Sequence, residues 1–146
     1  MARPRTHLVV SCALGFMLWR RTGKLLAAFA PLLGGFLVDA DHLIDYGLYQ
    51  RRGGGRPIYL LLHGWEYAPL LWWFERGHRH TTGGGVTLGF VSHLLIDQMT
   101  NGVSGPWHYF LIFRALHGFS RSLWRRSSSP PSDWRRVPLR KAWHWF

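Results

Sequence analysis

The sequence places histidines and carboxylates inside its most apolar segments, and this limits how the chain can fold. In "GFVSHLLIDQMTNG", residues 89–102, His93 and Asp97 stand four residues apart and would share one face of an apolar helix. Burying an unpaired charge costs several kcal/mol, so such residues must pair with one another or with an ion. Any fold for this chain therefore has to satisfy these polar groups in its interior.

Three other apolar segments carry residues of the same kind. The groups are Asp39, Asp41 and His42 in "DADH", His63 and Glu66 in "HGWE", and His7 at the start of the first apolar segment. The spacing predicts that His63 and Glu66 lie on one face of a helix. Four segments thus bring an imidazole each, and three of them bring a carboxylate.

The acidic residues are few and unevenly placed. The chain has 18 lysines and arginines against seven acids, the first 38 residues contain no acid, and the last 49 contain only Asp133. A soluble surface usually mixes both signs throughout. We therefore interpret the acids beside histidines as interior groups, and not as charges that keep the protein in solution.

The apolar runs predict an all-α protein. Basic or glycine-rich stretches such as 20–24 and 51–56 separate the runs, and no run alternates with the period of a strand. We predict a helical bundle of four to five apolar helices, formed by residues 1–119 and followed by a basic tail, 120–146, that is poorly ordered or interfacial. The runs are 8–19, 25–38 (which leads into "DADHLIDYGLYQ"), 57–74, 86–100 and 107–119.

Several features favour membrane embedding over a soluble bundle. The runs are 12 to 18 residues long, shorter than the ~20 of a typical membrane span. However, they are rich in Leu, Phe and Trp, arginine fills the connections, and several tryptophans stand near segment ends, as in an interfacial belt. We expect a location in a membrane of the bacterial inner (plasma) membrane type. Orientation stays open, because 20–24 and 51–56 are both basic.

The interior histidines and carboxylates predict a metal site, if their segments pack together. A single cysteine, Cys12, excludes a disulfide framework and a thiolate site. Nitrogen and oxygen ligands suit a divalent cation such as zinc, with manganese or iron(II) as alternatives. The competing interpretation is that each pair is a local hydrogen bond in the core. His78 and His80, in "ERGHRHTT", are expected to lie in a solvated loop.

Four stretches, in this order and spacing, resemble the YdjM-like membrane-bound metal-dependent hydrolases: "RTHLVVSCALGF", "GGFLVDADHLIDY", "LLHGWEYAPLLWW" and "GFVSHLLIDQMTNG". The resemblance covers residues 5–117. More distantly, the chain is similar to the all-helical zinc-dependent phospholipase C and zinc single-strand nuclease fold. The resemblance implies metal ligands at His7, Asp39, Asp41, His42, His63, His93 and Asp97.

The third stretch departs from the family pattern at one position. A common family form has a second histidine four residues after the first, and here Tyr67 stands in that place, with Glu66 one residue earlier. Either Glu66 substitutes as a ligand or general base, or one metal position is weakened. Asp41, in the 39–41 group, is the other candidate base.

The resulting expectation is a metal-dependent hydrolase that acts on a phosphoester, because a bound cation lowers the pKa of water to about 7. Asp45 or Asn101 could hold the second nitrogen of a ligand histidine. The alternative is a non-catalytic membrane protein with structural His/acid clusters. The tail, with its arginines and tryptophans, favours anionic lipid or a partner over nucleic acid as its contact.

Overall fold

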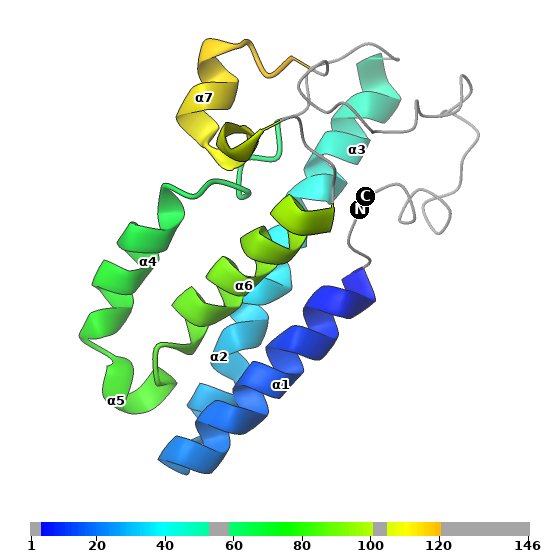
Figure 1. The fold of residues 1–146 in the computed structure, drawn as a ribbon. Helices are drawn as coiled ribbons and strands as arrows, with labels where there is room; N and C mark the ends of the chain where they lie inside the picture. Colours follow the sequence, from blue (N-terminus) through cyan, green and yellow to red (C-terminus); the bar gives the residue numbers. More distant parts are fainter. Residues whose placement is uncertain (1–3, 53–58, 101–104, 121–146) are drawn as a thin grey trace.

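The computed structural model describes residues 4–52, 59–100 and 105–120, and every regular element within them is a helix (Figure 1). The all-α prediction is therefore confirmed. The predicted tail lies outside the described residues from 121 onward. The helices are α1 (Pro4–Thr22), α2 (Leu25–Gly35), the 3-10 turn η1 (Leu37–Asp39), α3 (Ala40–Arg52), α4 (Tyr67–Arg76), α5 (Arg79–Thr82), α6 (Gly85–Thr100), η2 (Pro106–Tyr109) and α7 (Leu111–Leu116).

Helices α1, α2 and α6 pack side by side, and α4 lies against α6 (Figure 1). The chain runs along the bundle in α1, returns in α2, and continues through η1 into α3. It then runs along the bundle again in α4 and back in α6, and η2 and α7 follow at the end of the bundle where α4 begins. This path places the start of α1, the start of α3 and the end of α6 in one region.

Glycines let the central helices approach closely. A Cβ atom at Gly34 would overlap the carbonyl oxygen of Val86, and one at Gly89 would overlap that of Pro31, so α2 and α6 touch backbone to backbone. Small residues at such crossings are typical of helices that pack in membranes. The close approach matters for function because Gly35 and His93 lie at this same contact.

We expect Gly89→Ala to destabilise the fold, because the new methyl group must push α2 away from α6. The loss should be about 2 kcal/mol, the range found for overpacked cores, and thermal unfolding would measure it. Gly47→Ala is the matched control, since nothing lies within 4 Å of its added Cβ and it is also helical. The control should be neutral or stabilising. Equal melting temperatures for the two variants would contradict the close packing.

Glu75, the last acid of α4, holds the start of α6. Its carboxylate accepts hydrogen bonds from the backbone N–H of Val86 at 2.9 Å and of Thr87 at 2.8 Å, and from the Thr87 hydroxyl at 2.7 Å. Burial alone would raise the pKa of Glu75, but the Thr87 and Val86 hydrogen bonds outweigh it and hold the pKa below its ordinary value. The carboxylate satisfies donors that a helix start always leaves open.

We expect Glu75→Gln to lower the melting temperature at neutral pH, by the equivalent of about 1 kcal/mol for a lost helix cap. A folded pKa below the unfolded one means that the stabilisation is present above the ordinary value of 4.5 and is lost as the pH falls through the folded value. The difference between parent and variant should therefore shrink in acid. For Arg76→Gln, one residue further along the same helix, the difference in melting temperature from the parent should not shrink in acid. A difference that stays constant from pH 7 to pH 3 would contradict the role.

The prediction of a helix across 57–74 is wrong in its first half. Residues 59–66 form turns and irregular structure, and α4 begins only at Tyr67. The Asp45 carboxylate takes the backbone N–H groups of Tyr59 at 3.2 Å and Leu60 at 2.9 Å, and Leu60 has a left-handed φ of 38°. These contacts replace the helical hydrogen bonds, so His63 and Glu66 do not share a helix face.

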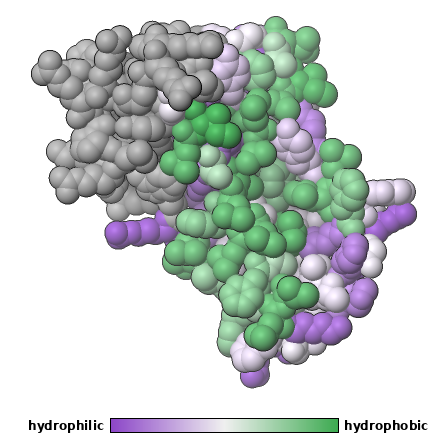
Figure 2. Space-filling model, turned by 180° about the vertical axis from the view of Figure 1, so that it is seen from behind, coloured by the Kyte–Doolittle hydropathy of each residue, from purple (hydrophilic) through white to green (hydrophobic). Residues whose placement is uncertain are grey.

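The outer surface of the bundle is apolar. Seen from behind, hydrophobic residues form a broad area through the middle of the described part of the molecule, with hydrophilic residues along one side and at the lower end (Figure 2). Phe74 is 72% exposed and Met99 is 84% exposed. One helical stretch, Leu25–Asp45, is long and apolar enough to cross a membrane by length and composition.

Candidate metal centre

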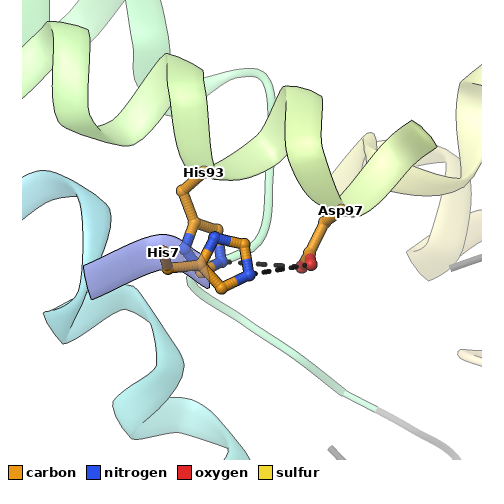
Figure 3. A group of neighbouring side chains, drawn as sticks. All are labelled: His7, His93 and Asp97. Carbon is orange, nitrogen blue, oxygen red and sulfur yellow. Dashed lines mark hydrogen bonds and ion pairs between the residues drawn. The ribbon is translucent and has the colours of Figure 1, made fainter. Parts of the chain in front are cut away.

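Six of the eight predicted ligands converge from five elements. They form two groups, and the ligand atoms within each group lie within 4.8 Å of one another. All six are buried. The first group is His7 from α1 with His93 and Asp97 from α6 (Figure 3); the second is Asp39 from η1, His42 from α3 and His63 from the turn before α4.

The two groups meet through their imidazoles. His63 Nε2 and His93 Nε2 are 3.0 Å apart. Asp39 Oδ1 lies 3.6 Å from each of these nitrogens, and Asp97 Oδ2 lies 3.5 Å from each. Four donor atoms from three separate parts of the chain, η1, the turn before α4 and α6, thus surround one point. The other oxygen of Asp97 is 3.2 Å from His7 Nε2, which extends the cluster to α1.

The outer nitrogens of the two central histidines are already used. His93 Nδ1 lies 2.8 Å from the Gly35 carbonyl oxygen, which can only accept, so Nδ1 carries the proton. His63 Nδ1 donates in the same way to Asp41 Oδ2 at 3.0 Å. In neutral imidazoles both Nε2 atoms then present lone pairs to each other. Two acceptors at this distance need a proton or a cation between them.

The spacings fit a common ion. Ligands at about 2.0–2.2 Å from one metal stand roughly 3.0–3.6 Å from one another in octahedral or tetrahedral arrangements. The separations of His63 Nε2 and His93 Nε2 from each other and from the two carboxylate oxygens, 3.0 to 3.6 Å, fall in that range. The donor set, imidazole nitrogen with carboxylate oxygen, suits zinc, manganese or iron(II).

The local charge also favours a cation. Asp39, Asp41 and Asp97 are buried together, and only one buried arginine, Arg114, is charged nearby in the described part of the chain. Burial would lower the pKa of His63, but hydrogen bonds to Asp39 and Asp41 outweigh it and raise the pKa to about 9. The raised pKa favours a proton on His63 Nε2 when no metal is present. A divalent cation would take the place of that proton.

Asp41 acts on His63 and not at the central point. Its Oδ2 accepts from His63 Nδ1 and, at 2.8 Å, from the backbone N–H of Leu62. This is the arrangement of a carboxylate that orients a ligand histidine and raises its basicity. Its Oδ1 is buried without a hydrogen-bond partner. Asp41 thus lies beside the cluster with one oxygen still available.

Glu66 lies outside both groups. Its two oxygens each accept a backbone N–H, from Leu111 and from Ile112, at 2.9 Å. Burial would raise the pKa of Glu66, but these two hydrogen bonds outweigh it and lower the pKa. In this structure the carboxylate stabilises the start of α7. The ring of Tyr67, in the family's histidine position, packs edge-on against Phe90 with centroids 6.3 Å apart.

Arg114, which the sequence analysis did not single out, holds the turn that carries His63. It is 0% exposed, and its guanidinium donates to the carbonyl oxygens of Tyr59 at 2.9 Å, Leu60 at 2.9 Å and His63 at 2.6 Å. Together with Asp45, which takes the N–H groups of Tyr59 and Leu60, it fixes the turn from both sides. The available signal was an arginine inside the last apolar segment, "FLIFRALHGF".

The remaining predicted residues lie elsewhere. His78 and His80 are exposed at α5, as expected of a solvated turn, and belong to neither group. Asp45 serves the turn backbone and not a ligand histidine. Asn101 lies outside the described residues. Comparisons with family models, with curated proteins and with solved structures find no match, so the family resemblance stays a prediction.

We expect Arg114→Met to destabilise the protein by about 3 kcal/mol, because three carbonyl groups, two of them buried, lose their donor. Arg114→Lys should recover only part of this, since an ammonium group lacks the planar fork that reaches all three. Thermal unfolding would measure both. Arg20→Met, an exposed arginine on α1, is the control and should change little. Parent-like stability of Arg114→Met would refute the role.

Proposed function

We propose that the protein is a membrane-bound, divalent metal-dependent hydrolase. The observation that carries the proposal is the 3.0 Å approach of two imidazole nitrogens that both lack a proton in their neutral forms, with two carboxylate oxygens 3.5–3.6 Å away. The proposed ligands are His7, Asp39, His42, His63, His93 and Asp97.

Each residue has a distinct part in this arrangement. His63 and His93 turn their Nε2 atoms inward because Asp41 and the Gly35 carbonyl hold their Nδ1 atoms. Asp97 links the two groups, because one oxygen faces His7 and the other faces the two central nitrogens. A divalent cation bound there would lower the pKa of a water molecule and supply a nucleophile near neutral pH.

A proton acceptor is available beside the ligands. Asp39 Oδ2 and Asp41 Oδ1 are buried carboxylate oxygens without a hydrogen-bond partner. We propose that Asp41 orients His63 and raises its basicity, because its Oδ2 is fixed by His63 and Leu62, and that its Oδ1 is the candidate proton acceptor. Glu66, the other candidate, has both oxygens engaged at α7. The substrate class we propose is a phosphoester, since two adjacent ligand groups suit two cations, which clamp such displacements.

The membrane part of the proposal rests on the surface. The largest apolar patch of a soluble monomer covers only a few hundred Å². Here large apolar side chains are exposed along α1, α2, α4 and α6, and hydrophobic residues cover much of the described part of the face in Figure 2. The exposed set includes Phe16, Met17, Leu26, Phe29, Leu33, Trp73, Phe74 and Met99.

A second candidate is a metal site with a purely structural role. The observation in its favour is burial: His63 is 0% exposed and His93 is 1% exposed. Structural metal sites are closed, and catalytic ones keep a position for water. The same cluster would then stabilise the crossing of α1, α2 and α6 without turnover.

The decisive measurement is the metal content of the purified full chain, by mass spectrometry, beside a His93→Ala/Asp97→Ala variant. We expect about one or two equivalents of zinc, manganese or iron in the parent, as the two ligand groups allow, and loss of most of it in the variant. His78→Ala/His80→Ala is the matched control, because it removes two exposed histidines and should keep the metal.

The loaded protein is then screened for phosphoester hydrolysis. Activity that falls by a factor of about 100 or more in Asp41→Asn, as for loss of a general base, supports the enzyme. Full metal loading with no turnover on any phosphoester supports the structural site instead. A folded parent that takes up no metal on titration, with His63 protonated in its place, would end both metal proposals.

A further inference from the structure

One end of the bundle, away from the metal centre, gathers exposed cations. Arg20 and Arg21 end α1, Lys24 precedes α2, and Arg76 and Arg79 flank the turn between α4 and α5. All five are exposed. In Figure 1 this is the lower end of the molecule, where α1 and α4 end and α5 lies. We call these five residues the basic end.

The fold brings the two halves of the basic end together. Gly83, the left-handed residue after α5, lies against α1 and α2: a Cβ there would be 3.3 Å from the Leu18 side chain, 3.6 Å from Thr22 and 3.7 Å from Ala27. Residues more than 50 positions apart in the chain thus share one surface. The grouping is a property of the structure and not of a basic stretch in the sequence.

No exposed acid among the described residues balances these charges. The acid at this end is Glu75, which is 7% exposed. Its carboxylate accepts hydrogen bonds from backbone N–H groups at the start of α6. The other described acids lie in or beside the metal centre and the turns around it. The basic end therefore presents five positive charges to the outside, and such a surface attracts an anionic partner.

Tryptophans link the basic end to the apolar surface. The Arg76 guanidinium lies 3.5 Å from the centroid of the Trp73 ring, and that of Arg79 lies 5.2 Å from Trp72. Both rings are exposed, beside the exposed Phe74. Arginine, tryptophan and exposed apolar side chains therefore adjoin one another here, as they do at a membrane–water boundary.

We propose that the basic end docks the phosphate groups of anionic phospholipids at the membrane surface. The inference rests on the membrane attachment proposed above and not on the metal. Single-stranded nucleic acid fits the same charge less well, because its bases need free aromatic faces. Here arginines occupy faces of Trp72 and Trp73, and the neighbouring apolar side chains would stay in water.

The test uses the full chain in non-ionic detergent micelles, titrated with short-chain phosphatidylglycerol or phosphatidylcholine. Native mass spectrometry and lipid-induced thermal stabilisation report binding. We expect the parent to prefer phosphatidylglycerol by at least about tenfold, and Arg76→Gln/Arg79→Gln to lose roughly 25-fold in that affinity, from about fivefold for each charge. Raising the salt concentration should weaken the preference.

Two controls make the result specific. Arg76→Lys/Arg79→Lys keeps the charge and should keep the lipid preference, and Arg5→Gln removes an exposed arginine from the other end of α1 and should leave it unchanged. All variants share the rest of the chain, so basic residues elsewhere contribute equally. The metal content of Arg76→Gln/Arg79→Gln should match the parent, which separates this inference from the metal centre.

Four results would overturn the inference. The first is equal affinity for the two lipids, and the second is a phosphatidylglycerol preference that survives Arg76→Gln/Arg79→Gln. The third is tighter binding of a single-stranded oligonucleotide that the same variant abolishes, which would assign the basic end to nucleic acid. A chain that stays monodisperse without detergent would remove the membrane premise and overturn it as well.

Discussion

The meeting of His63 Nε2 and His93 Nε2 is the constraint around which the interior is organised. Two nitrogen lone pairs at 3.0 Å repel each other unless a proton or a cation lies between them. Three buried carboxylates nearby further favour a positive charge at this point. A proton on His63 supplies that charge in part, and a divalent cation supplies it fully. The close crossing of α2 and α6 lies beside this pair of histidines. Gly35, at the crossing, supplies the carbonyl oxygen that binds His93 Nδ1 and so turns His93 Nε2 inward.

The positive charge of Arg114 is used differently. Its guanidinium donates hydrogen bonds to three carbonyl oxygens of the turn at 59–63. Asp45 binds the N–H groups of the same turn. A backbone segment with Leu60 in a left-handed conformation is thereby held in place without a helix. The rigidity of His63 comes from these two side chains and from Asp41.

Local sequence patterns were enough to predict the helical fold and the residues that converge. His93 and Asp97 are neighbours because α6 is a regular helix, which their spacing indicates directly. Asp39 and His42 are likewise close through local geometry, at 3.4 Å. Their meeting with His7 and His63 follows from a physical requirement: buried ionisable groups on several apolar segments can be satisfied only if the segments bring them together.

The same reasoning failed where tertiary contacts override local preference. "HGWEYAPLLWW" is apolar and contains no strong helix breaker before Pro69, so a helix was the natural prediction. Instead, Asp45 from α3 and Arg114 from α7 form hydrogen bonds with the backbone N–H and carbonyl groups of the turn at 59–63. Glu66 then faces α7, where its charge satisfies two N–H groups at a helix start. No local pattern indicates which carboxylate will serve a distant helix and which will face a metal.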